Sequence, residues 1–266
     1  MINLSSLHIL LTRPAHQAQQ SAIDFVDCGA RVTCHPFLVI TPLRDTADQQ
    51  MAKDPLLKLD HYQKMIFVIQ NAVHYGVQWI DQFWPQLPAG LAFFAVGKTT
   101  ADQLQQSLSY LDSGVQSPGY AMNSEGLLAL SALNDVKGQK ILIARGCGGR
   151  SHLAQTLERR GACVDYCELY QRQAPREIDI EKLEQFRQTS EKPVVLVLSG
   201  ETLDNLRKLL LDWNLEYWQW LQTQVLVVPG QRLADLARKQ NFQAIVVAKS
   251  AMRAHIIGAI NDWRKR

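Results

Sequence analysis

The chain has 266 residues, with 28 Lys and Arg against 25 Asp and Glu, and a formal net charge of +3. This positive excess is small and its residues are scattered, which does not indicate a nucleic-acid-binding protein. A hydrophobic fraction of 47% with 20% charged residues is typical of a folded globular protein, and the length suits two domains. Because the sequence contains no long uncharged apolar run and no basic leader segment, we expect neither membrane spanning nor secretion and predict a cytoplasmic protein.

The sequence repeats itself at about half its length. Residues 8–36 resemble residues 140–168 without a gap, and residues 96–102 resemble residues 229–235. A single period near half the chain length predicts two similar globular units rather than a solenoid. Two such units create a cleft, which is a usual place for a small-molecule site.

Strand and helix signals alternate along the chain. Short segments rich in Ile, Leu and Val predict strands at 8–12, 65–69, 92–96, 140–144, 194–198, 224–228 and 244–248. An amphipathic segment with helical periodicity follows each strand, Gly29 and Gly161 mark left-handed C-terminal caps, and Ser124 with Glu125 predicts a helix start. Apolar strands with intervening helices are typical of parallel sheets that helices cover on both faces. The predicted fold class is α/β, with two similar doubly wound parallel-sheet domains.

The turns that follow the predicted strands are the places to look for a site. Ligands of open α/β sheets bind beyond the carboxyl ends of the strands, where turns present backbone N–H groups and helix N-termini. These turns are 12–14, 70–72, 96–100, 145–150, 199–202 and 229–231. Turns of this composition also serve simply to reverse the chain, and that remains the alternative for each of them. Their recurrence in one repeated arrangement favours a binding site.

The glycine-rich turn at 145–150 differs from both common phosphate-binding motifs. Ser151 replaces the third small residue of the dinucleotide fingerprint, and no Gly-Lys-Ser/Thr follows as in a nucleotide P-loop. These differences exclude NAD, FAD and ATP sites of these types. Arg145 and Arg150 remain, either as bidentate ligands of carboxylates or as surface arginines that flank a turn.

Few side chains suggest catalysis or metal binding. The five cysteines form no CxxC pair, so we expect reduced thiols and no metal site. The seven histidines are dispersed and are expected to be structural. Tyr170 differs, because it ends the predicted strand 164–170 beside the polar segment 171–175, where a phenol is able to face a cleft as a proton donor. Packing without a catalytic role is the alternative for Tyr170.

Several motifs follow one another in a fixed order. They are Thr12-Arg13-Pro14, Asn71 to Val73, Val96 to Ala101, Ser124 to Leu127, and the pattern Arg145, Gly146, Gly149, Arg150, Leu153, Leu157, Gly161, Ala162, Val164 and Tyr170. As an ordered set, they resemble the uroporphyrinogen-III synthase family. One turn departs from the family pattern, because Val68 and Ile69 replace a Thr-Ser pair.

The resemblance implies a discontinuous first domain. Domain 1 is expected to comprise residues 1–37 and 173–266, and domain 2, inserted into it, residues 41–169. The crossovers at 37–42 and 169–175 are expected to act as a two-strand hinge that lets the domains open and close.

The resemblance also implies an activity. The family converts the linear hydroxymethylbilane into uroporphyrinogen III, with inversion of the last pyrrole ring and loss of water, in the cleft between the domains and without a metal or cofactor. The expected catalytic residue is Tyr170, and the expected partner is a small linear tetrapyrrole polycarboxylate, with neither nucleic acid nor membrane. The expected substrate-binding residues are Arg13, Asn71, Thr100, Ser124, Arg145, Arg150, Ser199 and Gly200. A monomer is expected, with transient contact to the preceding enzyme of the pathway.

Other functional classes remain open at this point. A catalytically degenerate paralogue that binds tetrapyrroles or tetrapyrrole enzymes would explain the loss of the Thr-Ser pair. A two-lobed binding protein would share the hinge and the cleft, but such proteins are usually exported. A nucleotide-dependent transferase is disfavoured by the missing phosphate-binding motifs.

Overall fold

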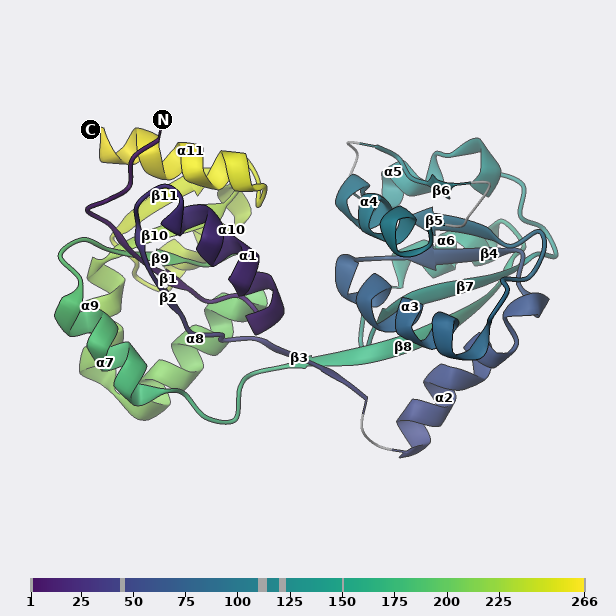
Figure 1. The fold of residues 1–266 in the computed structure, drawn as a ribbon, viewed down its shortest axis with the longest axis horizontal. Coiled ribbons are helices and arrows are strands. Elements are labelled where there is room, and N and C mark those ends of the chain that lie inside the picture. Colours follow the sequence, from purple (N-terminus) through teal and green to yellow (C-terminus); the bar gives the residue numbers. More distant parts are fainter. Residues whose placement is uncertain (1, 44–45, 110–113, 120–122, 150, 266) are drawn as a thin grey trace. The chain divides into compact units, whose positions relative to one another are not determined.

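A computed structural model of the chain describes residues 2–43, 46–109, 114–119, 123–149 and 151–265. The chain forms two compact units, of which unit 1 comprises Met1–Ile40 and Gln173–Arg266 and unit 2 comprises Thr41–Arg172. The chain therefore leaves unit 1, builds the whole of unit 2 and returns to unit 1. The colours of Figure 1, which run from purple at the N-terminus to yellow at the C-terminus, trace this path. Within the described ranges, no helix combines the length and the apolar composition that crossing a membrane requires.

Unit 1 contains a parallel five-stranded sheet in the order β11-β10-β9-β1-β2. Its strands are β1 (His8–Leu11), β2 (Arg31–Cys34), β9 (Pro193–Leu196), β10 (Val225–Pro229) and β11 (Ala244–Ala248). Its helices are α1 (Ala15–Val26), α7 (Ile180–Thr189), α8 (Gly200–Trp213), α9 (Leu215–Thr223), α10 (Gln231–Lys239) and α11 (Arg253–Arg264). Leu10 packs with α7 to α10 on one face, whereas Ile9 and Leu11 pack with α1 and α11 on the other.

Unit 2 contains a six-stranded sheet in the order β3-β8-β7-β4-β5-β6. Its strands are β3 (Val39–Pro42), β4 (Lys64–Phe67), β5 (Ala92–Ala95), β6 (Val115–Gln116), β7 (Lys140–Gly146) and β8 (Cys163–Gln173). Its helices are α2 (Thr46–Leu57), α3 (Gln70–Phe83), α4 (Lys98–Ser107), α5 (Ser124–Leu128) and α6 (His152–Arg159), with 3₁₀ turns at Leu59–His61 and Ser131–Leu133. Ile66 packs with α5 and α6, whereas the ring of Phe67 faces Gly76 of α3. Successive strand residues thus serve opposite faces of a sheet that helices cover on both sides.

The sequence repeat is visible in the strand register. In unit 1, β1 pairs with β2 from His8 opposite Arg31, and in unit 2, β7 pairs with β8 from Lys140 opposite Cys163. These are the residues that the two repeated segments place in equivalent positions. The predicted α/β class with two similar parallel-sheet domains is confirmed.

The predicted elements agree with the structure to within about two residues at the strand ends. All seven listed strand segments are strands, and Gly29 and Gly161 both have a φ of +87°, as their predicted capping role requires. The strand pattern at 164–170 lies within β8, which continues three residues beyond Tyr170. Three further strands, β2, β3 and β6, are absent from the prediction, because they are too short or too polar to produce an apolar run. The helix predicted to start at Ser124 does so and ends at Leu128. Its N-cap is Asn123, whose side chain accepts a hydrogen bond from the Gly126 N–H at 2.8 Å.

Both segments that the resemblance assigns to crossovers contain strand residues. In the first, β3 covers Val39–Pro42, and in the second, β8 continues to Gln173. Leu169 and Tyr170 are buried in unit 2. Tyr170 is therefore held by the sheet of unit 2.

A shift in register fixes how Tyr170 packs. Arg145 of β7 lies opposite Glu168 of β8, but the next residue, Gly146, lies opposite Tyr170, so that β8 gains one residue. The Tyr170 ring lies directly on Gly146, where a Cβ atom would come within 2.5 Å of the ring carbon Cε2. After this point the Cys147 N–H donates to the Tyr170 carbonyl at 2.8 Å. The ring position thus depends on the absence of a side chain at residue 146.

We predict that Gly146→Ala destabilises the protein by about 1–3 kcal/mol, because the added methyl group overlaps the Tyr170 ring. The free energy of unfolding in urea measures this loss. Gly258→Ala is the matched control, because a Cβ atom at this α11 position meets nothing within 4 Å. The control should be neutral or stabilising by up to about 1 kcal/mol. Equal stability of Gly146→Ala and the wild type would refute the packing described.

His8 of β1 is a buried histidine with two hydroxyl partners. Its Nδ1 lies 2.8 Å from the Ser190 hydroxyl and its Nε2 lies 2.8 Å from the Thr33 hydroxyl. Burial, together with the charge of Arg31, lowers the pKa of His8 to about 4. The unfolded chain therefore binds a proton at His8 before the folded protein does.

We predict that stability falls as the pH is lowered from about 6.5 toward 4, and that His8 accounts for a loss of about 2 kcal/mol at pH 5. This loss is absent above pH 6.5, because the folded and unfolded states then both hold His8 neutral. Urea unfolding of the wild type and of His8→Gln across this range measures the difference, with the exposed His61→Gln as a control. Parallel loss of stability in all three proteins would contradict the assignment.

Candidate functional site

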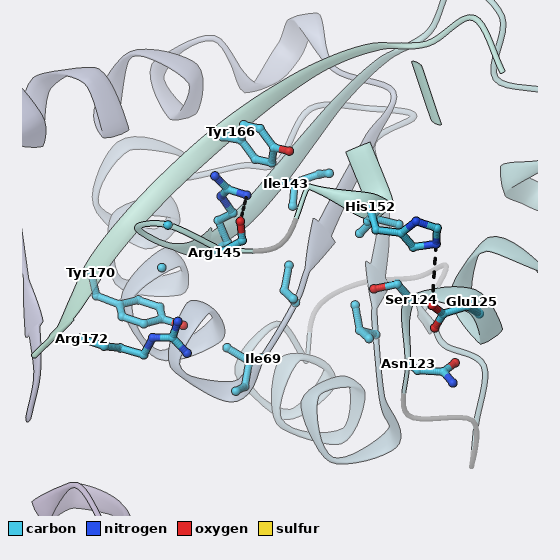
Figure 2. A pocket seen from close by; sticks show the side chains of 16 residues that line it. Ile69, Asn123, Ser124, Glu125, Ile143, Arg145, His152, Tyr166, Tyr170 and Arg172 are labelled. Atoms are coloured by element: carbon cyan, nitrogen blue, oxygen red, sulfur yellow. Dashed lines mark hydrogen bonds and ion pairs between the residues drawn. The ribbon is translucent and has the colours of Figure 1, made fainter. Parts of the chain in front are cut away.

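A pocket of about 410 Å³ lies in unit 2, beyond the carboxyl ends of β4 and β5 and beside the ends of β7 and β8. Parallel α/β sheets bind ligands at this edge. The lining residues are Val68, Ile69, Val96, Asn123, Ser124, Glu125, Ile143, Arg145, Gly146, Gly148, Gly149, His152, Leu153, Tyr166, Tyr170 and Arg172. In Figure 2 the pocket has two polar ends, with Tyr170 and Arg172 at one and Ser124, Glu125 and His152 at the other.

Tyr170 is the titratable group that the sheet places most firmly in this pocket. Only 3% of its surface is exposed, and burial raises the pKa of its phenol to about 12, against the opposing charge of Arg172. The ring of Tyr75 lies beside it, with centroids 5.5 Å apart. At neutral pH the phenol is therefore protonated and able to donate a hydrogen bond into the pocket.

Arg145 lines the pocket, but its guanidinium is bound by the protein. Its Nε–H and Nη2–H donate to Glu168 Oε1 at 3.0 and 2.7 Å, and its Nη1–H donates to the Gly149 carbonyl at 3.1 Å. The guanidinium carbon also lies 3.6 Å from the centroid of the Tyr166 ring. The arginine that the sequence proposes as a carboxylate ligand thus already holds a carboxylate of its own chain.

The opposite end of the pocket is formed by the first turns of α5 and α6. His152 Nε2 lies 3.7 Å from Glu125 Oε1, and Figure 2 shows the two side chains turned toward one another. Ser124 follows the N-cap residue Asn123. This end combines a carboxylate, an imidazole and a hydroxyl at two helix N-termini.

The structure brings some of the predicted site residues together and separates others. Ser124, Arg145 and Tyr170 line the pocket. Asn71 and Thr100 lie at the starts of α3 and α4 in the same unit, but both are buried and neither lines the pocket. Arg150 lies outside the described residues. Arg13, Ser199 and Gly200 belong to unit 1.

In unit 1 the predicted residues support two helix N-termini. Arg13 precedes α1 and donates to the Ser21 hydroxyl at 3.0 Å and to Gln17 Oε1 at 3.3 Å, and burial lowers the pKa of its guanidinium. Ser199 is the N-cap of α8, where its hydroxyl accepts from the Thr202 N–H at 3.1 Å, and Gly200 is the first helical residue. The N-terminus of α8 presents backbone N–H groups that suit an anion.

Sequence reasoning missed four polar lining residues, namely Asn123, Glu125, His152 and Arg172. Arg172 follows Tyr170 by two residues on β8, and this spacing places both side chains on the same side of the strand. The sequence could therefore have predicted that Arg172 lies beside Tyr170 in the site. Asn123, Glu125 and His152 meet only because α5 and α6 pack together, and the sequence does not show that contact. Where the family's Thr-Ser pair is missing, Val68 and Ile69 give the pocket an apolar wall.

Acidic, cysteine and histidine side chains are the usual ligands of metal ions in proteins. Among the residues that the structure describes, no group of three or more of them is arranged to hold a metal ion. The chemistry of the pocket described above rests on a phenol, an arginine and the Glu125–His152 pair.

Comparison with known proteins identifies the family. The family model described as uroporphyrinogen-III synthase HemD matches residues 21–258. The uroporphyrinogen-III synthase of Escherichia coli is 33% identical over 263 residues, which covers 96% of this chain and 100% of that protein. The corresponding protein of Salmonella typhimurium is 33% identical over 257 residues, with 96% and 100% covered.

Solved structures agree at the level of the fold. The crystal structure of uroporphyrinogen-III synthetase from Helicobacter pylori has a TM-score of 0.59 at 12% identity, and covers 97% of this chain and 99% of that one. A mutant uroporphyrinogen III synthase from Thermus thermophilus has a TM-score of 0.56 at 13% identity, with 97% and 98% covered. From the matched family model and the relatives of full length, we conclude that this chain belongs to the uroporphyrinogen-III synthase family.

Proposed function

We propose that this chain is an enzyme, a lyase that cyclises hydroxymethylbilane to uroporphyrinogen III with inversion of the last pyrrole ring and loss of water. The observation that carries the proposal is membership of the family over residues 21–258, combined with a buried phenol in a pocket at the carboxyl edge of a parallel sheet. The substrate is a linear tetrapyrrole, whose acetate and propionate groups require hydrogen-bond donors.

Most of the reactivity in this reaction belongs to the substrate. Loss of the hydroxymethyl oxygen as water leaves an electrophilic azafulvene, which the substituted carbon of the last ring attacks. The spiro intermediate then fragments and closes again with that ring inverted. The protein must hold the bilane so that direct head-to-tail closure is disfavoured, and such positioning is a recognised source of rate.

Tyr170 is the proposed donor to the leaving hydroxyl. As the C–O bond breaks, the oxygen takes up one proton, and the pyrrole nitrogen loses one as the azafulvene forms, so that the phenol ends the step protonated. A pKa of about 12 makes complete release of the phenol proton costly. The phenol therefore acts mainly by a hydrogen bond that strengthens as negative charge develops on the leaving oxygen.

We also propose partners for the substrate carboxylates. We propose the backbone N–H groups at Ser199 and Gly200, where α8 begins, as one anion site, because a helix N-terminus favours negative charge. Ser124 and Arg172 are proposed on the basis of their place in the pocket. The roles of the remaining predicted ligands, Arg13, Asn71, Thr100 and Arg150, stay predictions from the family resemblance.

The assembly of the protein is also a proposal. We propose a monomer that acts in the cytoplasm and makes transient contact with the preceding enzyme of the pathway. The crossovers at 37–42 and 169–175 are proposed as the hinge. Light scattering of the purified chain tests whether it is a monomer, and light scattering of its mixture with that enzyme tests the contact.

The proposed reaction predicts that the pure protein, supplied with freshly generated hydroxymethylbilane in the presence of a chelator, yields the type III isomer in excess over a control without protein. Chromatography of the oxidised products separates type III from type I. If a folded protein gave type I alone, the enzyme proposal would fail, and a degenerate paralogue would take its place.

We predict that Tyr170→Phe lowers kcat by roughly 10-fold to 100-fold with little change in KM, because the lost hydrogen bond matters mainly in the transition state. Tyr75→Phe is the matched control, since it removes a neighbouring phenol from the same aromatic pair. We also expect no loss of activity from ionisation of Tyr170 below about pH 11. Equal kcat values for the two variants would count against Tyr170 as the donor.

A further inference from the structure

We infer that Glu168 is a positioning residue for the proposed reaction: it holds the Arg145 guanidinium against the Tyr166 ring, so that Arg145 supports the turn at 146–149 and, through it, Tyr170. The inference rests on the proposed function, because Tyr170 acts in that reaction. It assigns Arg145 to the support of the pocket rather than to the binding of substrate carboxylates.

The first observation is that the Arg145 guanidinium is bound by groups of its own chain. Glu168 is its register partner on the adjacent strand, and Tyr166 precedes Glu168 by two residues on the same side of β8. The ion pair therefore forms between neighbouring strands without any loop, and the ring packs on the guanidinium plane. Three of its five N–H groups thus donate to a carboxylate and a carbonyl of the protein, and an aromatic ring covers one face.

The second observation is that Arg145 is more enclosed than its partner. The Arg145 side chain is 13% exposed and that of Glu168 is 35% exposed. A pair as accessible as this gains little from charge alone, so the acceptor oxygen of Glu168 matters more than its charge. Loss of that acceptor should therefore drive Arg145 toward solvent or toward another acceptor.

The third observation connects Arg145 to the phenol. Arg145 Nη1–H binds the Gly149 carbonyl, which closes the turn onto β7. Within this turn Gly146 lies against the Tyr170 ring, and the Cys147 N–H binds the Tyr170 carbonyl. Movement of the turn is thus transmitted to Tyr170 through direct contacts.

A second cavity lies on the other side of Arg145 and Tyr166. A space of about 470 Å³ is lined by Leu43, Met51, Ala52, Arg145, Cys147, Tyr166 and Glu168. Arg145 and Tyr166 line both this space and the pocket that contains Tyr170. Release of Arg145 would join the two, and the pocket would lose the wall that limits where a pyrrole ring lies.

The kinetic test compares Glu168→Ala and Arg145→Met with Glu168→Gln, which keeps a hydrogen-bond acceptor at Oε1. The first two should lower kcat about tenfold with KM within about twofold, because a misplaced donor costs rate rather than binding. Glu168→Gln should restore most of that rate. Asp235→Ala is the control, since it removes an exposed ion pair with Arg238 in unit 1.

A second readout does not depend on activity. Cys147 lies in the supported turn, whereas Cys163 is exposed at the start of β8 in the same unit. In Glu168→Ala the rate at which iodoacetamide labels Cys147, measured by mass spectrometry relative to Cys163, should rise severalfold. Glu168→Gln and Asp235→Ala should leave this ratio unchanged.

The outcomes separate the two proposals. A rise in KM for Arg145→Met together with a fall in KM for Glu168→Ala would overturn the inference, because Arg145 would then bind substrate and Glu168 would compete for it. Unchanged Cys147 labelling in Glu168→Ala would overturn it as well.

If Glu168→Ala does not fold, the labelling of Cys147 in Arg145→Met, compared with that in the wild type, decides in the same way. A wild type that makes no type III isomer would defeat the proposed function, whereas the labelling would still decide whether Glu168 supports the turn.

Discussion

The packing of the Tyr170 ring on the backbone of Gly146 is the contact on which the pocket depends. It exists because β8 gains one residue relative to β7 just before β7 ends at Gly146. The same contact buries the phenol, which raises its pKa to about 12 and keeps it protonated. One local irregularity in a regular parallel sheet thus sets the position and the protonation state of the proposed donor.

Charge in this pocket is used in two different ways. Arg145 is enclosed by Glu168, Tyr166 and the Gly149 carbonyl, where its rigid planar group fastens two strands and a turn. Arg172, two residues beyond Tyr170, is exposed at the pocket and lowers the cost of negative charge on the phenol. In the proposed reaction the substrate supplies both the electrophilic and the nucleophilic carbon. The protein then has to provide a fixed hydrogen-bond donor, a rigid pocket wall and a nearby positive charge.

Local patterns made much of the fold predictable. The repeated segments carry the β1–β2 and β7–β8 pairs in the same register, and apolar runs mark the central strands, because buried parallel strands are apolar throughout. The exposed strand β2 and the two-residue strand β6 carry no such run. Tyr170 was proposed as a site residue because it ends a predicted strand beside a polar segment.

The parts of the site that sequence reasoning missed depend on tertiary contacts. The sequence around Arg145 does not show that its guanidinium binds the carboxylate of Glu168 on the neighbouring strand. Likewise, Glu125 and His152 meet through the packing of two helices. Residue type therefore suggested which side chains could bind an anion, but only the structure shows which of them is already occupied.

The most direct measurement is a crystal structure with an unreactive bilane bound, in which a methyl group replaces the terminal hydroxymethyl group. The account predicts that this methyl group lies against the Tyr170 hydroxyl, while Arg145 remains on Glu168 and the substrate carboxylates contact other donors. A bilane carboxylate bound to Arg145, with Tyr170 remote from the terminal ring, would contradict both the proposed donor and the proposed support of the pocket.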